Sequence, residues 1–230
     1  GLVTGDGIRR IDLKSLNNVR IKNERLLCFY NSIIYNGKVL SNDTYKDESK
    51  VKYYDVNELI AAKEGEAPAV TELDIIQKQK INFVLAKDGN VYTLESADNG
   101  CNIVKIKNDF TLEKVFANFQ PAKGPYHSSP TIGMVASETE NIIYLVSTDG
   151  AIYKYILGDS DSLKAPFIAA ESGVSITAPL QLNQQSGELY VTYTEERKDE
   201  SKIVVYSKDG KVLHTVDCGE SVPSQILFNN

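Results

Sequence analysis

Two histidines restrict the chemistry that this chain of 230 residues can perform. His127 ends a long polar connection, residues 118–127, which also holds Lys123 and Tyr126. A tyrosine ring and an imidazole can stack on a sugar, or hydrogen-bond to a sugar or a peptide. We therefore expect a ligand-binding set on the connections between strands, made up of Lys123, Tyr126, His127, Glu171 and Glu220. The alternative is an ordinary exposed loop. His214, inside an alternating run, is expected to be structural or to face solvent.

The carboxylates show no catalytic spacing. Asp6, Asp149 and Asp209 stand in Asp-Gly turns, where the side chain stabilises the turn itself. A glycosidase would need two or three acids that face one another, and the available candidates are Glu138, Glu171, Glu220 and Asp74. No pattern selects any of them. Signatures of a nucleophile elbow, a phosphate-binding loop or a dinucleotide site are missing from the sequence, so we predict no catalytic residue.

Three cysteines, Cys28, Cys101 and Cys218, lie far apart and form no C-x-x-C pair. An odd number argues against a disulfide framework, so we expect free thiols that pack as small apolar side chains. A metal site of imidazole and thiolate would need His127 to meet a distant cysteine, and no ligand spacing supports this. The sequence predicts no metal site and no cofactor.

The overall charge limits the kind of partner. The formal net charge is -6 at pH 7, so we do not expect the broad basic surface that binds a nucleic-acid backbone. No run approaches the roughly 18 apolar residues of a membrane span. The first residues, GLVTGDGIRR, lack the apolar core of a signal peptide. We expect a protein or carbohydrate partner, no nucleic acid, no transmembrane segment and a monomer.

The elements that must position these residues are strands. Residues 128–158 hold three apolar or alternating runs, and Thr148-Asp149-Gly150 forms the turn between the second and the third. An Asp-Gly pair accepts the positive φ that a tight hairpin needs. Further turns of this kind are expected at Asn36-Gly37, Asp88-Gly89 and Asp209-Gly210. Residues 1–21 predict two strands and a short edge, and residues 57–66 predict one or two helical turns.

Internal repetition indicates a β-propeller. The segment KDES occurs twice, at residues 46–49 and 198–201, and Pro130, Pro179 and Pro223 mark the starts of three inner strands. The chain begins at a second strand and finishes with SVPSQILFNN, an inner strand, so its two ends can share one blade. We predict a single all-β domain over residues 1–230, a five-bladed β-propeller closed by N- and C-terminal strands. The alternative is a part of a larger ring of six to eight blades.

A family resemblance agrees with this fold. The segment SSPTIG, followed by NIIYLVSTDGAIYKY, resembles the repeat of quinoprotein-like (PQQ-repeat) propellers, and residues 210–219 resemble its outer strand. That family usually has tryptophan in the outer strand, where this chain, which has none, carries His214. Members that bind a quinone are dehydrogenases, and their metal and cofactor ligands have no matching positions here. Relatives without a cofactor include cell-envelope scaffolds, so the resemblance implies a secreted protein or one of the cell envelope.

Two functions follow from these observations. The first is a non-enzymatic binding or scaffold module that holds a protein or glycan partner at one face of the ring. The second is a glycan-processing hydrolase with carboxylates at the mouth of the channel. The lack of catalytic spacing favours the first.

Overall fold

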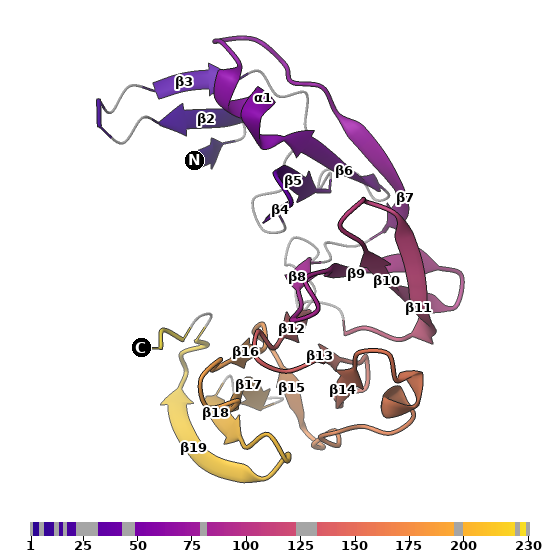
Figure 1. Ribbon diagram of the computed structural model, residues 1–230. Coiled ribbons are helices and arrows are strands. Elements are labelled where there is room, and N and C mark those ends of the chain that lie inside the picture. Colours follow the sequence, from indigo (N-terminus) through magenta and orange to yellow (C-terminus); the bar gives the residue numbers. More distant parts are fainter. Residues whose placement is uncertain are drawn as a thin grey trace. The chain divides into compact units, whose positions relative to one another are not determined.

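The computed structural model describes residues 2–4, 7–11, 14–15, 18–21, 32–42, 49–78, 82–122, 133–195, 200–223 and 226–228. The chain divides into two compact units, Gly1–Phe83 and Val84–Asn230, and each is described by itself. Both contain antiparallel sheets whose neighbouring strands follow one another along the chain, except that β15 and β16 both pair with β17 (Figure 1). The predicted all-β class is confirmed.

The first unit contains two sheets among its described residues. One has the order β1–β2–β3 and consists of β1 (Leu2–Thr4), β2 (Gly7–Ile11) and β3 (Asn18–Ile21). The other has the order β4–β5–β6–β7 and consists of β4 (Ile33–Tyr35), β5 (Lys38–Ser41), β6 (Ser49–Asp55) and β7 (Thr71–Gln77). A short helix, α1 (Val56–Ala61), lies between β6 and β7. The two expected N-terminal strands and their short edge are confirmed.

Local chemistry explains two of these elements. Asn36 and Gly37 both have positive φ, 46° and 71°, as a two-residue hairpin requires. The helix α1 begins after Asp55, whose Oδ1 accepts hydrogen bonds from the backbone N–H groups of Asn57 at 2.7 Å and Glu58 at 3.3 Å. The predicted turn and the predicted helical turns are therefore both present.

The second unit contains three sheets among its described residues. The first consists of β8 (Val84–Leu85), β9 (Val91–Ala97), β10 (Gly100–Ile106) and β11 (Leu112–Phe119). The second consists of β12 (Met134–Ala136), β13 (Ile142–Val146) and β14 (Ile152–Ile156), followed by the 3-10 helix η1 (Ser160–Leu163). The third consists of β15 (Val174–Ile176), β16 (Gln181–Leu182), β17 (Leu189–Glu195), β18 (Ser201–Tyr206) and β19 (Val212–Gly219).

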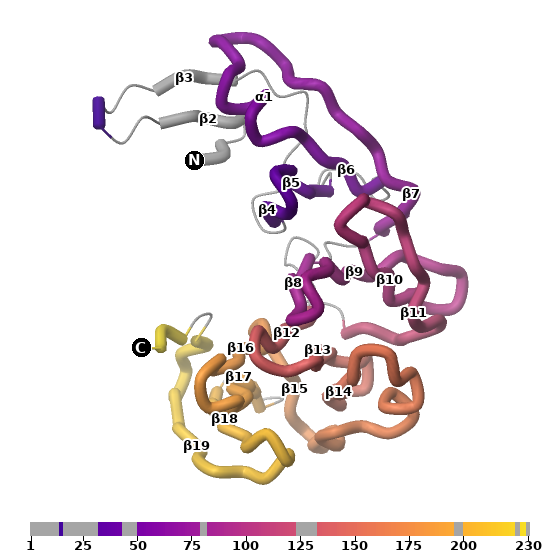
Figure 2. The backbone as a smooth tube through the Cα atoms, in the orientation of Figure 1, coloured from indigo at the N-terminus to yellow at the C-terminus, as the bar shows by residue number. Residues whose placement is uncertain are grey.

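The three sheets of the second unit pack against one another. Their early strands β8, β12 and β16 lie side by side, and the path of the chain from sheet to sheet can be followed in Figure 2. An apolar cluster joins Tyr144 and Ile152 of the second sheet to Leu189, Val191 and Tyr193 of the third. Each of these side chains is at most 2% exposed, so the core lies between the sheets, as it does between blades of a propeller.

The structure corrects the prediction around Pro179. Pro179 was expected to begin one inner strand, but the chain around it forms two short strands, β15 and β16, which both pair with β17. Pro179 lies between them, and proline has no N–H for a strand ladder. Residues 165–170 form no strand, and Ile168 makes a single bridge, to Ile152.

The C-terminal segment differs as well. In SVPSQILFNN, the described residues 221–223 and 226–228 form no strand, although they do lie beside the third sheet. Ile226 donates its backbone N–H to Gln181 Oε1 of β16 at 2.7 Å, and the rings of Phe228 and Tyr190 lie 5.0 Å apart. The sheet that contains β1 has the order β1–β2–β3, so the number of blades and the closure of the ring stay predictions. Pro130 lies outside the described residues, as do residues 46–48 and 198–199 of the two KDES segments.

Candidate ligand-binding site

Of the five ligand-binding residues predicted from sequence, the structure describes two, Glu171 and Glu220. Lys123, Tyr126 and His127 lie outside the described residues. Glu171, just before β15, forms an ion pair of 3.0 Å with Lys202 of β18. Glu220 follows β19 directly and is exposed. The predicted set therefore stays a prediction.

The other carboxylates that a hydrolase could use have separate surroundings. Asp74 lies on β7 and forms an exposed ion pair of 3.2 Å with Lys50. Glu138 lies between β12 and β13 and donates its backbone N–H to Gln184 Oε1 at 2.8 Å. His214 is exposed on β19, as expected of a histidine that faces solvent. Among the described contacts, no hydrogen bond or ion pair joins Asp74, Glu138 and His214 to one another.

The described cysteines are free thiols, as predicted. Cys101 is buried in β10, and burial, with a smaller effect of Glu95, raises the pKa of its thiol to about 11. Cys218 on β19 is partly exposed. Within the described ranges, no group of three or more histidine, cysteine, aspartate or glutamate side chains could hold a metal ion. No described helix is long and apolar enough to cross a membrane.

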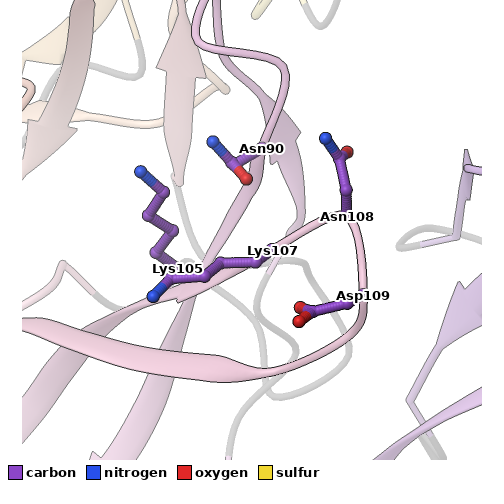
Figure 3. Close-up of a pocket in the computed structure, with 5 residues that line it drawn as sticks. All are labelled: Asn90, Lys105, Lys107, Asn108 and Asp109. Carbon is purple, nitrogen blue, oxygen red and sulfur yellow. The ribbon is translucent and has the colours of Figure 1, made fainter.

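A polar pocket lies at one end of the first sheet of the second unit. Its volume is about 440 Å³, and its lining consists of Asn90, Lys105, Lys107, Asn108 and Asp109 (Figure 3). These residues come from two hairpin turns and the end of β10. The turn of residues 86–90 joins β8 to β9, and the turn of residues 107–111 joins β10 to β11. Because β9 and β10 are antiparallel neighbours, both turns lie at the same end of the sheet.

One carboxylate organises the first half of the pocket. Asp88 accepts a hydrogen bond from Tyr92 Oη at 2.8 Å and forms an ion pair of 2.9 Å with Lys105. The ammonium of Lys105 also lies 5.8 Å from the centre of the Tyr92 ring, within reach of a cation–π interaction. The backbone N–H of Asn90 donates to Asp88 as well, at 3.1 Å. Lys105 and Asn90 are therefore held in place before any ligand binds.

The pKa values follow from these contacts. Partial burial raises the pKa of Asp88, but its hydrogen bonds with Lys105, Tyr92 and Asn90 together outweigh burial, so the pKa is lowered. Burial raises the pKa of Tyr92, and the negative charge of Asp88 raises it further. Asp88 is therefore ionised at neutral pH, while Tyr92 stays a neutral hydrogen-bond donor.

The second half of the pocket is held by Glu113 and Thr111. Lys107 forms an ion pair of 2.9 Å with Glu113, which raises the pKa of the lysine and lowers the pKa of the glutamate. Asp109 accepts hydrogen bonds from the hydroxyl of Thr111 at 2.6 Å and from its backbone N–H at 3.0 Å, and these lower the pKa of Asp109. The two lysines of the lining are thus each paired with a carboxylate, Lys105 with Asp88 and Lys107 with Glu113.

Sequence reasoning found the turn at residues 87–90 but missed the pocket. A signal was available, because Lys105 near the end of β10 and Lys107 in the turn that follows it are only two residues apart. What the sequence did not supply is the register, which sets Lys105 opposite both Tyr92 and Glu113. The pocket offers amide, ammonium and carboxylate groups but no nucleophile paired with a base, so its geometry suits binding.

Solved structures with a similar backbone are of β-propeller type. A puromycin hydrolase is 13% identical, with a TM-score of 0.59 over 93% of this chain and 32% of that chain. Prolyl oligopeptidase B from Galerina marginata is 12% identical, with a TM-score of 0.53 over 86% of this chain and 28% of that chain. Virginiamycin B lyase from Staphylococcus aureus is 13% identical, with a TM-score of 0.48 over 97% of this chain and 68% of that chain.

This chain spans less than a third of the length of the first two proteins, and at these identities the likeness shows the fold alone. A search of curated protein sequences found no match. A family model described as "Domain of unknown function (DUF5074)" matches residues 2–229. The chain therefore belongs to the DUF5074 family, with an all-β fold of β-propeller type.

Proposed function

We propose that this chain is a non-enzymatic β-propeller module that binds a protein or glycan partner. The observation that carries the proposal is the polar pocket, whose lining of amide, ammonium and carboxylate groups offers hydrogen-bond donors and acceptors to a ligand. Five described carboxyl groups have a pKa that departs from the ordinary value, and in all five the pKa is lowered: Asp55, Asp88, Asp109, Glu113 and Asp149. These groups are ionised at neutral pH and cannot donate a proton to a leaving group.

A glycan-processing hydrolase, the second candidate, has the opposite requirement. Its general acid needs a raised pKa so that it is protonated when the glycosidic bond breaks. The acids of the polar pocket are instead held as carboxylates by Lys105, Lys107 and Thr111. Fixed charges of this kind can position a ligand through hydrogen bonds, but none of these acids is protonated as the general acid must be.

The proposal includes a closed ring of five blades, a single domain over residues 1–230, with the quinoprotein-like repeat that the sequence resembles. The position of residues 226–228 supports closure. They lie next to β16, where the inner strand of a following blade would lie, yet they form no strand. Val222 and Leu227 in the same segment are 46% and 81% exposed. We propose that this segment pairs with β1, as the repeat in the sequence predicts.

The proposed location is outside the cytoplasm, either secreted or in the cell envelope, and the proposed state is a monomer. The resemblance to cofactor-free quinoprotein-like scaffolds supports this location. Lys123, Tyr126, His127, Glu171 and Glu220 remain the proposed contact residues for a partner at one face of the ring.

Binding and turnover can be measured on the same samples. The purified full chain is incubated with labelled neutral and acidic oligosaccharides, chromatography detects cleavage and calorimetry detects binding. We expect binding of at least one oligosaccharide, or of a protein partner, with every oligosaccharide recovered intact. Cleavage that Glu138→Gln, Glu171→Gln, Glu220→Gln or Asp74→Asn abolishes would contradict the proposal and favour the hydrolase.

A further inference from the structure

We infer that the polar pocket formed by residues 86–90, 105 and 107–111 binds a neutral carbohydrate. The inference rests on the proposed binding function and gives it a ligand class and a place. It places the carbohydrate at a different site from Lys123, Tyr126 and His127, which were predicted from sequence. The pocket volume of about 440 Å³ lies in the range of roughly 300–1,000 Å³ that small-molecule sites occupy.

The lining indicates a ligand that both donates and accepts hydrogen bonds. Asn90 and Asn108 each offer an amide oxygen and an amide NH₂ group, Lys105 and Lys107 offer ammonium donors, and Asp109 offers a carboxylate. A sugar hydroxyl donates one hydrogen bond and accepts others, so the hydroxyls of a sugar match a lining that holds both donors and acceptors. An apolar ligand would leave these groups without hydrogen bonds on one side.

The charge around the pocket selects against an anion. The ammonium groups of Lys105 and Lys107 are matched by the carboxylates of Asp88, Asp109 and Glu113, so no positive charge is in excess. A phosphate or an acidic sugar would have to displace Asp88 or Glu113 from its lysine. A neutral sugar can use the same groups with both ion pairs intact.

Two polar groups of the pocket, the Lys105 ammonium and the backbone N–H of Asn90, are fixed in advance. Lys105 is held by Asp88, and the N–H of Asn90 is held by the same carboxylate. The hydroxyl of Tyr92 donates a hydrogen bond to Asp88. Tyr92 itself is 2% exposed and packs edge-on against Tyr155 of the second sheet, with ring centres 6.5 Å apart. Pre-organised groups lose little conformational entropy on binding, which favours affinity for a weakly held polar ligand.

Phe110 supports the same conclusion. Four hairpin turns of the second unit share one hydrogen-bond pattern, in which the fourth residue donates its N–H to the first: residues 86–90, 107–111, 147–151 and 207–211. Three of them have glycine at the fourth position, with φ between 74° and 83°, whereas the turn at the pocket has Phe110 with φ 64°. A bulky residue in this region is strained by roughly 1–2 kcal/mol.

Strained residues gather at functional sites because their side chain serves a purpose that offsets the strain. Phe110 follows the lining residue Asp109 and is only partly buried. In the proposed complex, the ring of Phe110, which neighbours the pocket in sequence and is not part of its lining, packs on the C–H face of the sugar. The structural alternative is a solvated end of a hairpin, which needs neither the pocket nor the phenylalanine.

The test is a titration of the full ¹⁵N-labelled chain with four neutral trisaccharides, namely maltotriose, cellotriose, mannotriose and xylotriose, and with trigalacturonic acid as the acidic arm. The readouts are the side-chain amide signals of Asn90 and Asn108 and the dissociation constant from calorimetry. We expect at least one neutral trisaccharide to shift both amide signals, and the acidic one to bind at least tenfold more weakly.

Three variants probe the pocket, and a fourth variant is the matched control. Asn108→Thr introduces the residue that the turn at 147–151 has at the same position, Lys107→Met removes an ammonium, and Phe110→Gly restores the glycine of the other turns. Each is expected to weaken binding at least tenfold while the backbone spectrum is retained. The control, Lys208→Thr, makes the same kind of change in the turn at 207–211 and should bind as the wild type does.

Several results would overturn the inference. One is the absence of shifts at Asn90 and Asn108 with every trisaccharide, and another is wild-type affinity in Asn108→Thr and Phe110→Gly. If a trisaccharide binds but Tyr126→Ala or His127→Ala abolishes binding instead, the pocket is wrong while the binding function stands. If the trisaccharide is cleaved, the proposed function itself is wrong. Stronger binding of trigalacturonic acid would overturn the neutral ligand class.

Discussion

At the scale of single residues, Asp88 has the most connections in the candidate site. It joins the buried Tyr92 to Lys105 and fixes the backbone of Asn90. Its side chain is 23% exposed, so solvent screens the ion pair only in part. The half of the pocket that contains Lys105 and Asn90 therefore depends on the ionised carboxylate of Asp88, so loss of its charge should lower the stability of the fold.

Asp88→Asn is expected to lower the free energy of unfolding by about 1 kcal/mol at pH 7, because an ion pair with charge-assisted hydrogen bonds is lost. The folded pKa of Asp88 lies below its unfolded value. Its stabilisation is thus complete above the unfolded pKa of about 4 and disappears as the pH falls through the folded pKa. Urea unfolding at pH 7 and at pH 2 should show that the difference from wild type narrows at the lower pH.

Glu220→Gln, at an exposed position, is the control for that experiment and should change stability little at either pH. An equal loss for Asp88→Asn at both pH values would show that the ion pair with Lys105 does not stabilise the fold.

The two described thiols are expected to differ in reactivity. The thiolate is the form that reacts, and the pKa of Cys101, raised to about 11, leaves little thiolate at pH 8. Cys218 is more exposed. With iodoacetamide at pH 8, peptide mass spectrometry should show Cys218 modified well before Cys101. Equal rates for the two would indicate that β10 opens readily.

At the scale of elements, the repeated hairpin turn is the unit from which the second half of the chain is built. Glycine at its fourth position takes a positive φ that other residues adopt at some expense. The surroundings of that glycine differ between copies. A Cβ at Gly150 would meet no atom within 4 Å, whereas a Cβ at Gly210 would lie 3.3 Å from the ring and the carbonyl oxygen of Phe167.

Gly150→Ala and Gly210→Ala form a matched pair. Both are expected to lose about 1 kcal/mol of stability from the backbone conformation. Gly210→Ala should lose more, because Phe167 must also move. Chemical unfolding of the two variants measures the difference. Equal losses would mean that the contact of the turn with Phe167 contributes nothing.

Many of these elements could be predicted from sequence. Alternating runs and Asp-Gly pairs located β13, β14 and the turn between them, and Asn36-Gly37 located the hairpin of β4 and β5. Pro179 was read as the start of a strand, although it separates two strands that share the partner β17. That difference depends on tertiary pairing, which no local pattern contains.

The pocket escaped prediction for a related reason. Its residues come from two turns that are neighbours only because β9 and β10 pair in one register, with Lys105 opposite Tyr92. A shift of the register by one residue would place Lys105 on the other face. Composition and spacing identify the turns, but side-chain pairing across strands sets what the turns present.

At the scale of the whole molecule, the proposed fold is a closed ring of blades. We propose that β1 pairs with the C-terminal segment, which would convert its exposed Val222 and Leu227 into part of a blade. A shared blade of this kind ties the chain ends together and leaves no open edge, which protects a propeller against unfolding from its ends.

Hydrogen exchange measured by mass spectrometry tests this closure most directly. The full chain is compared with a chain that lacks residues 220–230, and the readout is amide exchange in residues 2–4. We predict slow exchange there in the full chain and markedly faster exchange after the deletion, while β9 and β10 stay protected in both. Unchanged exchange in residues 2–4 after the deletion would contradict closure of the ring.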